Sequence, residues 1–272
     1  MLRNCFGYTL YKDKEHNFGI CSSYIEQSPG STHDVHTLMP ITGANIEMYI
    51  YKEKQSLAFI LLTLFGFVLL WAVVTDAWGY SSNLAFNYGK QVYALLCRLF
   101  WVFPAICLIK RHSDSLSIGK KELFSKPVWN RPLATILIIS VILSFVGMLI
   151  IHRGLRLNPA IRNPLDIIVI CCVGFVEETV FRGWGYNALR GIVSEKKAAI
   201  LSTLFFVLLH SPAYFVRCYR LGAMDYVTWI IQSISATVWG IVFCRLLKKS
   251  KTIWNPIIAH VVYDVFVTVF VE

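Results

Sequence analysis

The chain has 272 residues, of which 56% are hydrophobic and only 15% are charged, and its formal net charge is +10. Apolar runs of 18 residues or more recur along it, which excludes an ordinary soluble domain and indicates membrane-spanning helices. A charge of this sign alone would suggest nucleic-acid binding, but its distribution along the chain argues against that class of partner.

Residues 1–55 are polar and rich in turn-forming residues, with no sustained helical period. We predict that they form a polar cytoplasmic N-terminal extension. Residues 56–163 are expected to be supporting transmembrane helices, because their apolar segments carry almost no polar side chains at depth. Residues 164–272 contain the unusual polar residues and are expected to form a catalytic transmembrane core.

Seven apolar segments predict an all-α, polytopic transmembrane helix bundle of about seven spans, within a range of six to eight. The second segment is interrupted by a charged residue, Arg98. Either its side chain snorkels to the membrane surface, or it marks a shorter helix. The fourth segment is the least hydrophobic, since it contains an acid pair. The segments are 57–75, 92–109, 133–151, 165–189, 198–216, 226–247 and 253–271.

Basic residues are distributed unevenly between the two sets of loops. With the N-terminus inside, the cytoplasmic loops hold 18 of the 26 Lys and Arg residues and the opposite loops hold six. This bias follows the positive-inside rule, so it predicts an integral, multi-pass membrane protein with its N-terminus inside. No nucleic-acid partner is expected.

The fourth segment contains Glu177, Glu178 and Arg182. Each charge at the bilayer centre costs about 2.5–3.5 kcal/mol on insertion scales, so it is retained only when it is paired or functional. Glu178 and Arg182 are four residues apart and can pair on one helix face, which leaves Glu177 free to face a cavity and accept a proton from water. The alternative is a buried ion-pair network formed by all three side chains.

The fifth segment places Phe206 four residues before His210, and Pro212 follows two residues later. Proline removes a backbone donor and opposes helical geometry before it, so a break or kink is predicted at His210. Non-helical backbone at membrane depth is tolerated where it lines a wet cavity. The alternative is a core histidine bonded to a neighbouring helix.

The seventh segment begins with Asn255 and Pro256, an N-cap followed by a residue suited to the first turn. His260 then lies about one turn inside the helix, and Asp264 follows at i+4 on the same face. The alternative is a structural His–Asp pair.

Three motifs therefore occur in order: Glu177, Glu178 and Arg182, then Phe206 and His210, then His260 and Asp264. This set resembles the CPBP family of CAAX prenyl proteases type II, Abi proteins and bacteriocin-processing or immunity proteins, over residues 164–271. The resemblance implies a glutamate-dependent intramembrane endopeptidase. By that likeness, Glu177 activates a water with help from His210, while His260 and Asp264 polarise the carbonyl and stabilise the oxyanion.

Asp264 stands where the best-studied branch of this family has asparagine. A neutral amide can donate a hydrogen bond to an oxyanion, whereas an ionised carboxylate can only accept. Asp264 is therefore either protonated, or it orients His260 instead.

The resemblance does not decide whether a metal ion is needed or which substrate is cut. Two histidines, a glutamate and an aspartate could coordinate Zn²⁺ with an open position, but no His-Glu-x-x-His motif is present, and we expect no metal. The expected partners are membrane lipid and a peptide or protein substrate, such as a C-terminal sorting tail, a leader peptide or a prenylated CAAX tail. The expected location is the inner (cytoplasmic) membrane in a bacterium or an endomembrane in a eukaryote.

Two other functions compete with the peptidase. One is a non-enzymatic family member, acting as an immunity protein or a membrane scaffold. The other is a transporter with a buried ion relay, which explains three ordered motifs poorly. The complete set of polar residues favours the enzyme, because a scaffold has little reason to keep charges in lipid.

Overall fold

The computed structural model describes residues 8–12, 18–22, 57–73, 89–152, 163–220, 222 and 224–270, and the chain divides into two compact units, 1–56 and 57–272. The first unit contains an antiparallel pair of strands, β1 (Tyr8–Lys12) and β2 (Phe18–Ser22), in which Tyr8 lies opposite Ser22. The sequence analysis did not predict this pair. The other residues of the predicted extension 1–55 lie outside the described part, and its cytoplasmic location stays a prediction.

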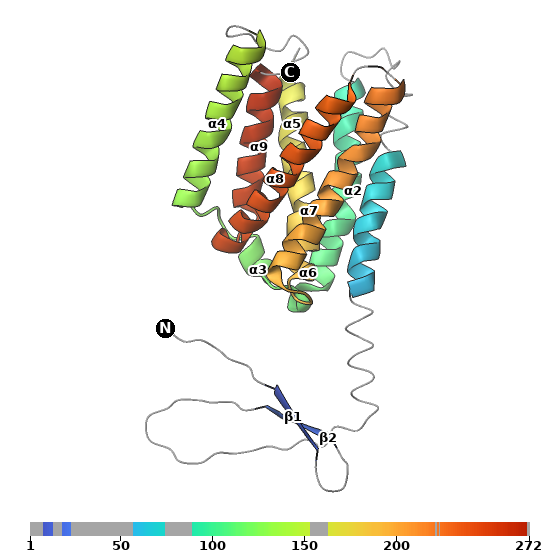
Figure 1. The fold of residues 1–272 in the computed structure, drawn as a ribbon, viewed down its shortest axis with the longest axis vertical. Coiled ribbons are helices and arrows are strands. Elements are labelled where there is room, and N and C mark those ends of the chain that lie inside the picture. Colours follow the sequence, from blue (N-terminus) through green and yellow to red (C-terminus); the bar gives the residue numbers. More distant parts are fainter. Residues whose placement is uncertain are drawn as a thin grey trace. The chain divides into compact units, whose positions relative to one another are not determined.

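The second unit is a bundle of helices, which confirms the predicted all-α membrane bundle for this part of the chain (Figure 1). Each of the seven predicted segments is helical where it is described, except that Ile253 lies in the turn before α9. The helices are Leu57–Val73, α2 (Gly89–Arg111), η1 (Ser113–Ser115), α3 (Lys120–Leu123), α4 (Arg131–His152), α5 (Pro164–Glu178), η2 (Thr179–Tyr186), α6 (Asn187–Leu189), α7 (Glu195–Phe215), η3 (Val216–Arg220), α8 (Tyr226–Ser250) and α9 (Trp254–Phe270).

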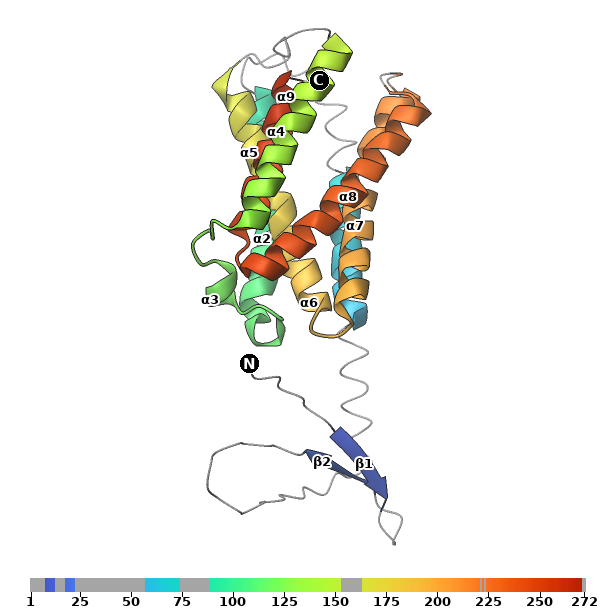
Figure 2. The ribbon, with the colours of Figure 1, turned by 60° about the vertical axis from the view of Figure 1, so that its left-hand side comes forward.

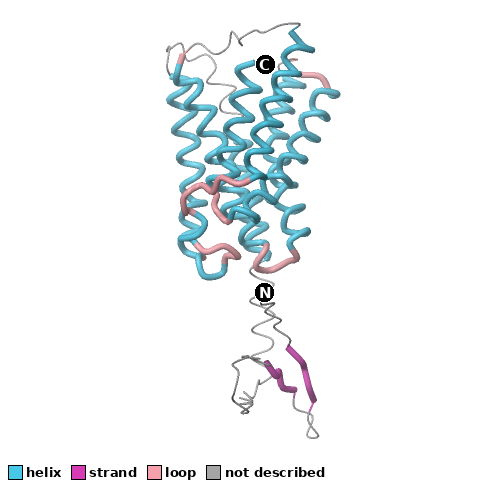
Figure 3. Tube along the Cα trace, turned by 90° about the vertical axis from the view of Figure 1, so that its left-hand side faces the viewer, coloured by secondary structure: helices cyan, strands magenta, loops and turns pink. Residues whose placement is uncertain are grey.

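Three helices in the described part of the chain are long and apolar enough to cross a membrane: Gln91–Arg111, Glu195–Tyr219 and Tyr226–Ser250. Leu57–Val73, Arg131–Gly147 and Trp254–Val269 are apolar but shorter. The number of spans and the inward N-terminus stay predictions. The described loops before α4, α7 and α9 lie in the same half of the second unit, with the loop before α7 at its end (Figure 2), and Figure 3 draws loops in pink between the cyan helices.

The second helix is not shortened by Arg98, because α2 runs without interruption from Gly89 to Arg111. Arg98 Nη1 donates to the carbonyl oxygen of Ala94 one turn earlier, at 3.1 Å, and the guanidinium lies 5.5 Å from the centroid of the Trp71 ring. A carbonyl and an aromatic face therefore stabilise this cation within the apolar helix.

The fourth segment is not a uniform α-helix. It begins with a capping box at Asn163, whose side chain accepts from the Leu165 amide while the Asp166 side chain accepts from the Asn163 amide. After Glu178 the backbone widens into the π-helix η2, every residue of which is buried. No residue pattern indicated this wide turn, although π-turns are frequent at functional sites.

Of the break or kink predicted at His210, the break is wrong and the kink stays a prediction. The α7 helix continues through Pro212 to Phe215, and the deviation comes later, in the π-helical segment η3. A proline in a membrane helix loses one backbone hydrogen bond, and local π adjustment can compensate for it without a break. His210 therefore projects from a continuous helix.

The predicted N-cap at Asn255 is also wrong, because α9 begins one residue earlier, at Trp254. The Asn255 side chain instead pairs with the backbone of Val128 in both directions, accepting from its amide at 2.9 Å and donating to its carbonyl at 2.7 Å. Asn255 therefore anchors the loop that precedes α4 to the start of α9.

Two glycines permit the close helix contacts that position the polar residues. A Cβ atom at Gly174 of α5 would lie 2.8 Å from Val261 Cγ2 of α9, and one at Gly240 of α8 would lie 2.6 Å from Thr203 Cγ2 of α7. Both distances are too short for carbon atoms, so any larger residue would push these helices apart. At Gly174 the backbone of α9 also lies close, with Val261 N at 3.1 Å from such a Cβ, whereas the atoms near Gly240 belong to the side chains of Thr203 and Arg182.

Candidate active site

The acid pair lies at the end of α5, where the α-helix passes into η2. The Glu178 and Arg182 side chains are both 0% exposed, and Arg182 Nη1 donates to Glu178 Oε1 at 2.9 Å. The contact expected from their i,i+4 spacing is therefore present. Because neither side chain reaches water, each charge depends on the other for its stabilisation.

Glu178 Oε1 has a second partner, Nδ1 of His260, at 2.8 Å. A carboxylate oxygen that already pairs with Arg182 accepts hydrogen bonds, so Nδ1 of His260 carries a proton and its Nε2 faces the other way. This contact joins α5 to α9. The sequence analysis missed it, because no local spacing signals a contact between residues 82 positions apart.

Glu177 is placed differently from Glu178. Its Oε2 lies 4.0 Å from Nε2 of His210 and 3.9 Å from Nε2 of His260. Both distances exceed a hydrogen bond, and Oε2 is buried without a hydrogen-bond partner among the described residues. One water can bridge polar atoms at such separations. The arrangement thus suits a water held by a carboxylate and two imidazoles.

Asp264 completes the group, with its Oδ2 3.3 Å from Nε2 of His260. The structure therefore brings together all four predicted site residues, Glu177, His210, His260 and Asp264. The side chains of His210 and Asp264 are 26% and 22% exposed, whereas those of Glu177 and His260 are 10% and 7% exposed. A substrate would reach the two buried groups from the side of His210 and Asp264.

Phe206, which was predicted to support the site, lies at the centre of these residues. Its ring centroid is 4.2 Å from the Arg182 guanidinium carbon, 5.0 Å from the His210 ring and 6.0 Å from the His260 ring. A cation over an aromatic face is stabilised by the ring quadrupole. Phe206 thus supports Arg182 while it restricts the positions of both histidines.

Phe243 of α8 is a supporting residue that the sequence analysis missed. Its ring stacks on His260, with centroids 5.0 Å apart and planes inclined by 24°, and the Arg182 guanidinium lies 5.4 Å from its centroid. Phe243 belongs to an apolar segment without a polar motif, so nothing in the pattern distinguishes it from its neighbours.

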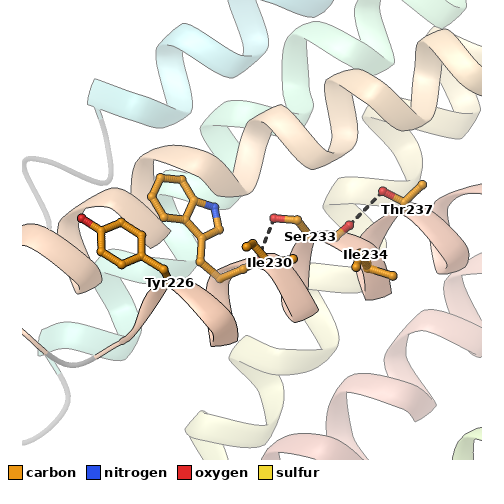
Figure 4. A pocket seen from close by; sticks show the side chains of 6 residues that line it. Tyr226, Ile230, Ser233, Ile234 and Thr237 are labelled. Atoms are coloured by element: carbon orange, nitrogen blue, oxygen red, sulfur yellow. Dashed lines mark hydrogen bonds between the residues drawn. The ribbon is translucent and has the colours of Figure 1, made fainter.

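A surface pocket elsewhere on α8 does not contribute to this chemistry (Figure 4). It is lined by Tyr226, Trp229, Ile230, Ser233, Ile234 and Thr237, which all come from the one helix. The Ser233 and Thr237 hydroxyls donate to carbonyl oxygens of their own helix. No carboxylate or imidazole lines this pocket.

Carboxylates and imidazoles such as those of this site are also ligands for metal ions. Among the described residues, no group of three or more His, Cys, Asp or Glu side chains is arranged to hold one. Nδ1 of His260 is already used by Glu178, and Nε2 lies beside Asp264. The side chains are thus arranged mainly to contact one another.

Residues 162–266 match a family model described as type II CAAX prenyl endopeptidase, Rce1-like. The matched region contains all seven motif residues, which confirms the family resemblance and indicates a membrane-bound protease. No curated protein matches the chain. No solved structure matches it either.

The Glu178 contacts predict a strong effect on stability. Glu178→Gln leaves the Arg182 charge buried and uncompensated and weakens the bond to His260, so the free energy of unfolding should fall by about 3–5 kcal/mol. Thermal unfolding in detergent measures this. The control is Glu195→Gln, which breaks an ion pair with Lys248 whose side chains are 42% and 48% exposed and should cost less than about 1 kcal/mol. Equal unfolding temperatures for the two variants would contradict the assignment.

Proposed function

We propose that this chain is an intramembrane endopeptidase in which Glu177 activates a water that attacks a peptide carbonyl. The observation that supports this most is the position of Glu177 Oε2, unbonded and about 4 Å from the Nε2 atoms of both His210 and His260. A purely structural carboxylate at this depth would be expected to have a partner. Glu178, which has two, shows what such a carboxylate looks like.

In the proposed reaction, the water lies between Glu177 and His210. Glu177 takes one proton as the water oxygen bonds to the carbonyl carbon, and it later gives that proton to the leaving amine nitrogen as the C–N bond breaks. Glu177 is thereby returned to its ionised form. His210 accepts a hydrogen bond from the water or donates one to it. This contact directs a lone pair of the water oxygen toward the carbonyl carbon.

His260 is proposed to stabilise the oxyanion through Nε2. Its Nδ1–H donates to Glu178, so an Nε2 proton is available when the ring is an imidazolium, and the carboxylates of Glu177 and Asp264 lie beside Nε2. An Nε2–H group within reach of the carbonyl oxygen would stabilise charge that develops in the transition state. Glu178 acts through His260 and is therefore a positioning residue.

The role of Asp264 follows from the same contact. Its Oδ2 lies 3.3 Å from Nε2 of His260, which suits an ionised carboxylate that orients and stabilises the imidazolium. We therefore favour orientation of His260 over direct donation to the oxyanion. As the carbonyl oxygen of the substrate becomes charged, the Nε2–H group of His260 would shift its hydrogen bond from Asp264 to that oxygen.

The substrate is proposed to be a peptide or protein segment at the membrane. Among a C-terminal sorting tail, a leader peptide and a prenylated CAAX tail, the description of the matched family favours the last. We place the enzyme in the membrane as a multi-pass protein with its N-terminus in the cytoplasm.

Substitution of the water-activating pair gives the main test. Glu177→Gln and His210→Ala should each lower cleavage of a prenylated CAAX peptide by about 10²–10⁴-fold, the usual contribution of a general base. Their unfolding temperatures should remain near that of the unmodified protein, because Glu177 makes no hydrogen bond through Oε2. The assay uses purified protein in liposomes, with Glu195→Gln as an active control.

The competing function is a non-enzymatic membrane protein in which the polar residues form only an ion-pair network. It would be supported if folded Glu177→Gln protein kept full biological activity. That outcome would reject the peptidase.

Replacement of Asp264 by asparagine separates its two roles. If Asp264 orients the imidazolium as a carboxylate, Asp264→Asn lowers kcat more than it changes KM, because His260 loses the group that directs its Nε2–H. If it instead donates to the oxyanion as a neutral acid, the amide replaces it and kcat is kept. We expect the first result.

No resident metal ion takes part in the proposed mechanism. The reason is the arrangement of the donors, since no three of the described His, Cys, Asp and Glu side chains are arranged to hold a metal. Peptide cleavage should be unchanged after dialysis against a strong chelator. Loss of activity that is restored by added Zn²⁺ would assign Glu177 and the two histidines to a metal site instead.

A further inference from the structure

A second polar feature lies away from the motif residues, between α4 and α8. It is a pocket of about 380 Å³, whose polar edge is formed by Arg131, Arg245 and Lys249 and whose apolar wall includes Ile136, Val242 and Leu246. No acidic residue lines it. Its lining residues come from the first turns of α4 and the last turns of α8, two helix ends that lie near each other (Figure 2).

The three cations of this pocket differ from other cations near the same end of α8. Lys248 pairs with Glu195 at 2.8 Å, and Lys251 pairs with Glu122 at 3.1 Å. Among the described residues, no ion pair involves Arg131, Arg245 or Lys249. The pocket therefore gathers positive charge that no carboxylate in the described part of the chain neutralises.

The spacing of two of these residues adds to the repulsion. Arg245 and Lys249 are four residues apart on α8, so they share one helix face, and like charges at that spacing destabilise a helix. Arg131 brings a third positive charge from α4 to the same pocket. An anion bound between them would remove the repulsion and join the two helices.

The apolar wall indicates what kind of anion fits. Beyond the pocket, α4 continues with exposed Ile138, Ile139 and Ile142, and α8 carries exposed Val238. A free inorganic anion would gain nothing from such a surface, whereas an acyl chain would bury it. Basic pockets between membrane helices on the cytoplasmic side characteristically bind anionic lipid headgroups.

We propose that the α4–α8 pocket binds the headgroup of an anionic phospholipid, with its phosphate between Arg131, Arg245 and Lys249. The acyl chains lie along the exposed apolar side chains of α4 and α8. Arginine suits this role because its guanidinium can contact two phosphate oxygens at once. This binding site is independent of the proposed peptidase reaction.

The pocket is connected by packing to the motif residues. Leu246 belongs to a small buried cluster with Leu133, Phe243 and Ala259, and Ile136 and Val242 pack against that cluster. Phe243 in turn stacks on His260. A lipid that holds α4 against α8 therefore stabilises the helices that surround His260.

Thermal unfolding of the full-length protein in detergent tests this proposal. Added phosphatidylserine or phosphatidylinositol phosphate should raise the unfolding temperature by several degrees, and phosphatidylcholine should not. The triple variant Arg131→Gln, Arg245→Gln, Lys249→Gln should lose that increase. The matched control is Lys120→Gln, Lys121→Gln, Lys126→Gln, which removes the same charge from exposed positions outside the pocket and should keep the increase.

Three results would overturn the proposal. Equal loss in the two triple variants would show that the lipid effect is a general attraction to positive charge. An equal increase with phosphatidylcholine would show that only the apolar wall matters, and full protection by inorganic phosphate would show that the anion is not a lipid. Arg245→Gln alone, compared with Lys120→Gln, provides the same comparison if the triple variant does not fold.

Discussion

The buried carboxylate of Glu178 is the group on which the rest of the site depends. One oxygen accepts from Arg182 within its own segment and from His260 on α9, so a single charge positions a cation and an imidazole. Glu178 carries the negative charge that Arg182 requires at membrane depth. It also determines which nitrogen of His260 is directed away from it. The neighbouring acid, Glu177, is thereby left without either task, and this difference between adjacent residues is the basis of the proposed chemistry.

The sequence predicted which residues would come together better than it predicted the contacts between them. Charged and imidazole side chains stand out in apolar segments, because placing them in lipid costs free energy. The i,i+4 spacing of Glu178 and Arg182 predicts a contact that the structure contains. The Glu178–His260 contact and the stacking of Phe243 depend on how helices pack, which spacing along the chain does not encode. The two local errors have a common cause. Proline and asparagine signals describe isolated helices, whereas here packing keeps α7 continuous and assigns Asn255 to the backbone of Val128.

The packing of the bundle explains how so many polar groups are accommodated in an apolar protein. Gly174 and Gly240 let the helices approach until the polar side chains reach one another, and Phe206 and Phe243 cover the Arg182 guanidinium with aromatic faces. The Ser202 hydroxyl donates to the Phe181 carbonyl oxygen at 2.7 Å, which joins α7 to η2. These contacts supply partners to polar groups that could not form hydrogen bonds with lipid. Rigid support of this kind is what a site requires if its reactive groups are to stay about 4 Å apart.

The π-helix η2 makes the site sensitive to the length of the chain as well as to its composition. A π-turn accommodates about one residue more than an α-turn, and Thr179–Tyr186 separates the acids of α5 from α6 and the loop before α7. If one residue were inserted or deleted there while the wide turn was kept, everything on one side would turn by about 100° relative to the other. Glu177 and Glu178 would then point to different neighbours, although no motif residue had changed. Variants with one residue inserted or deleted in this segment would therefore change the direction in which the acids point while the acids themselves stay the same.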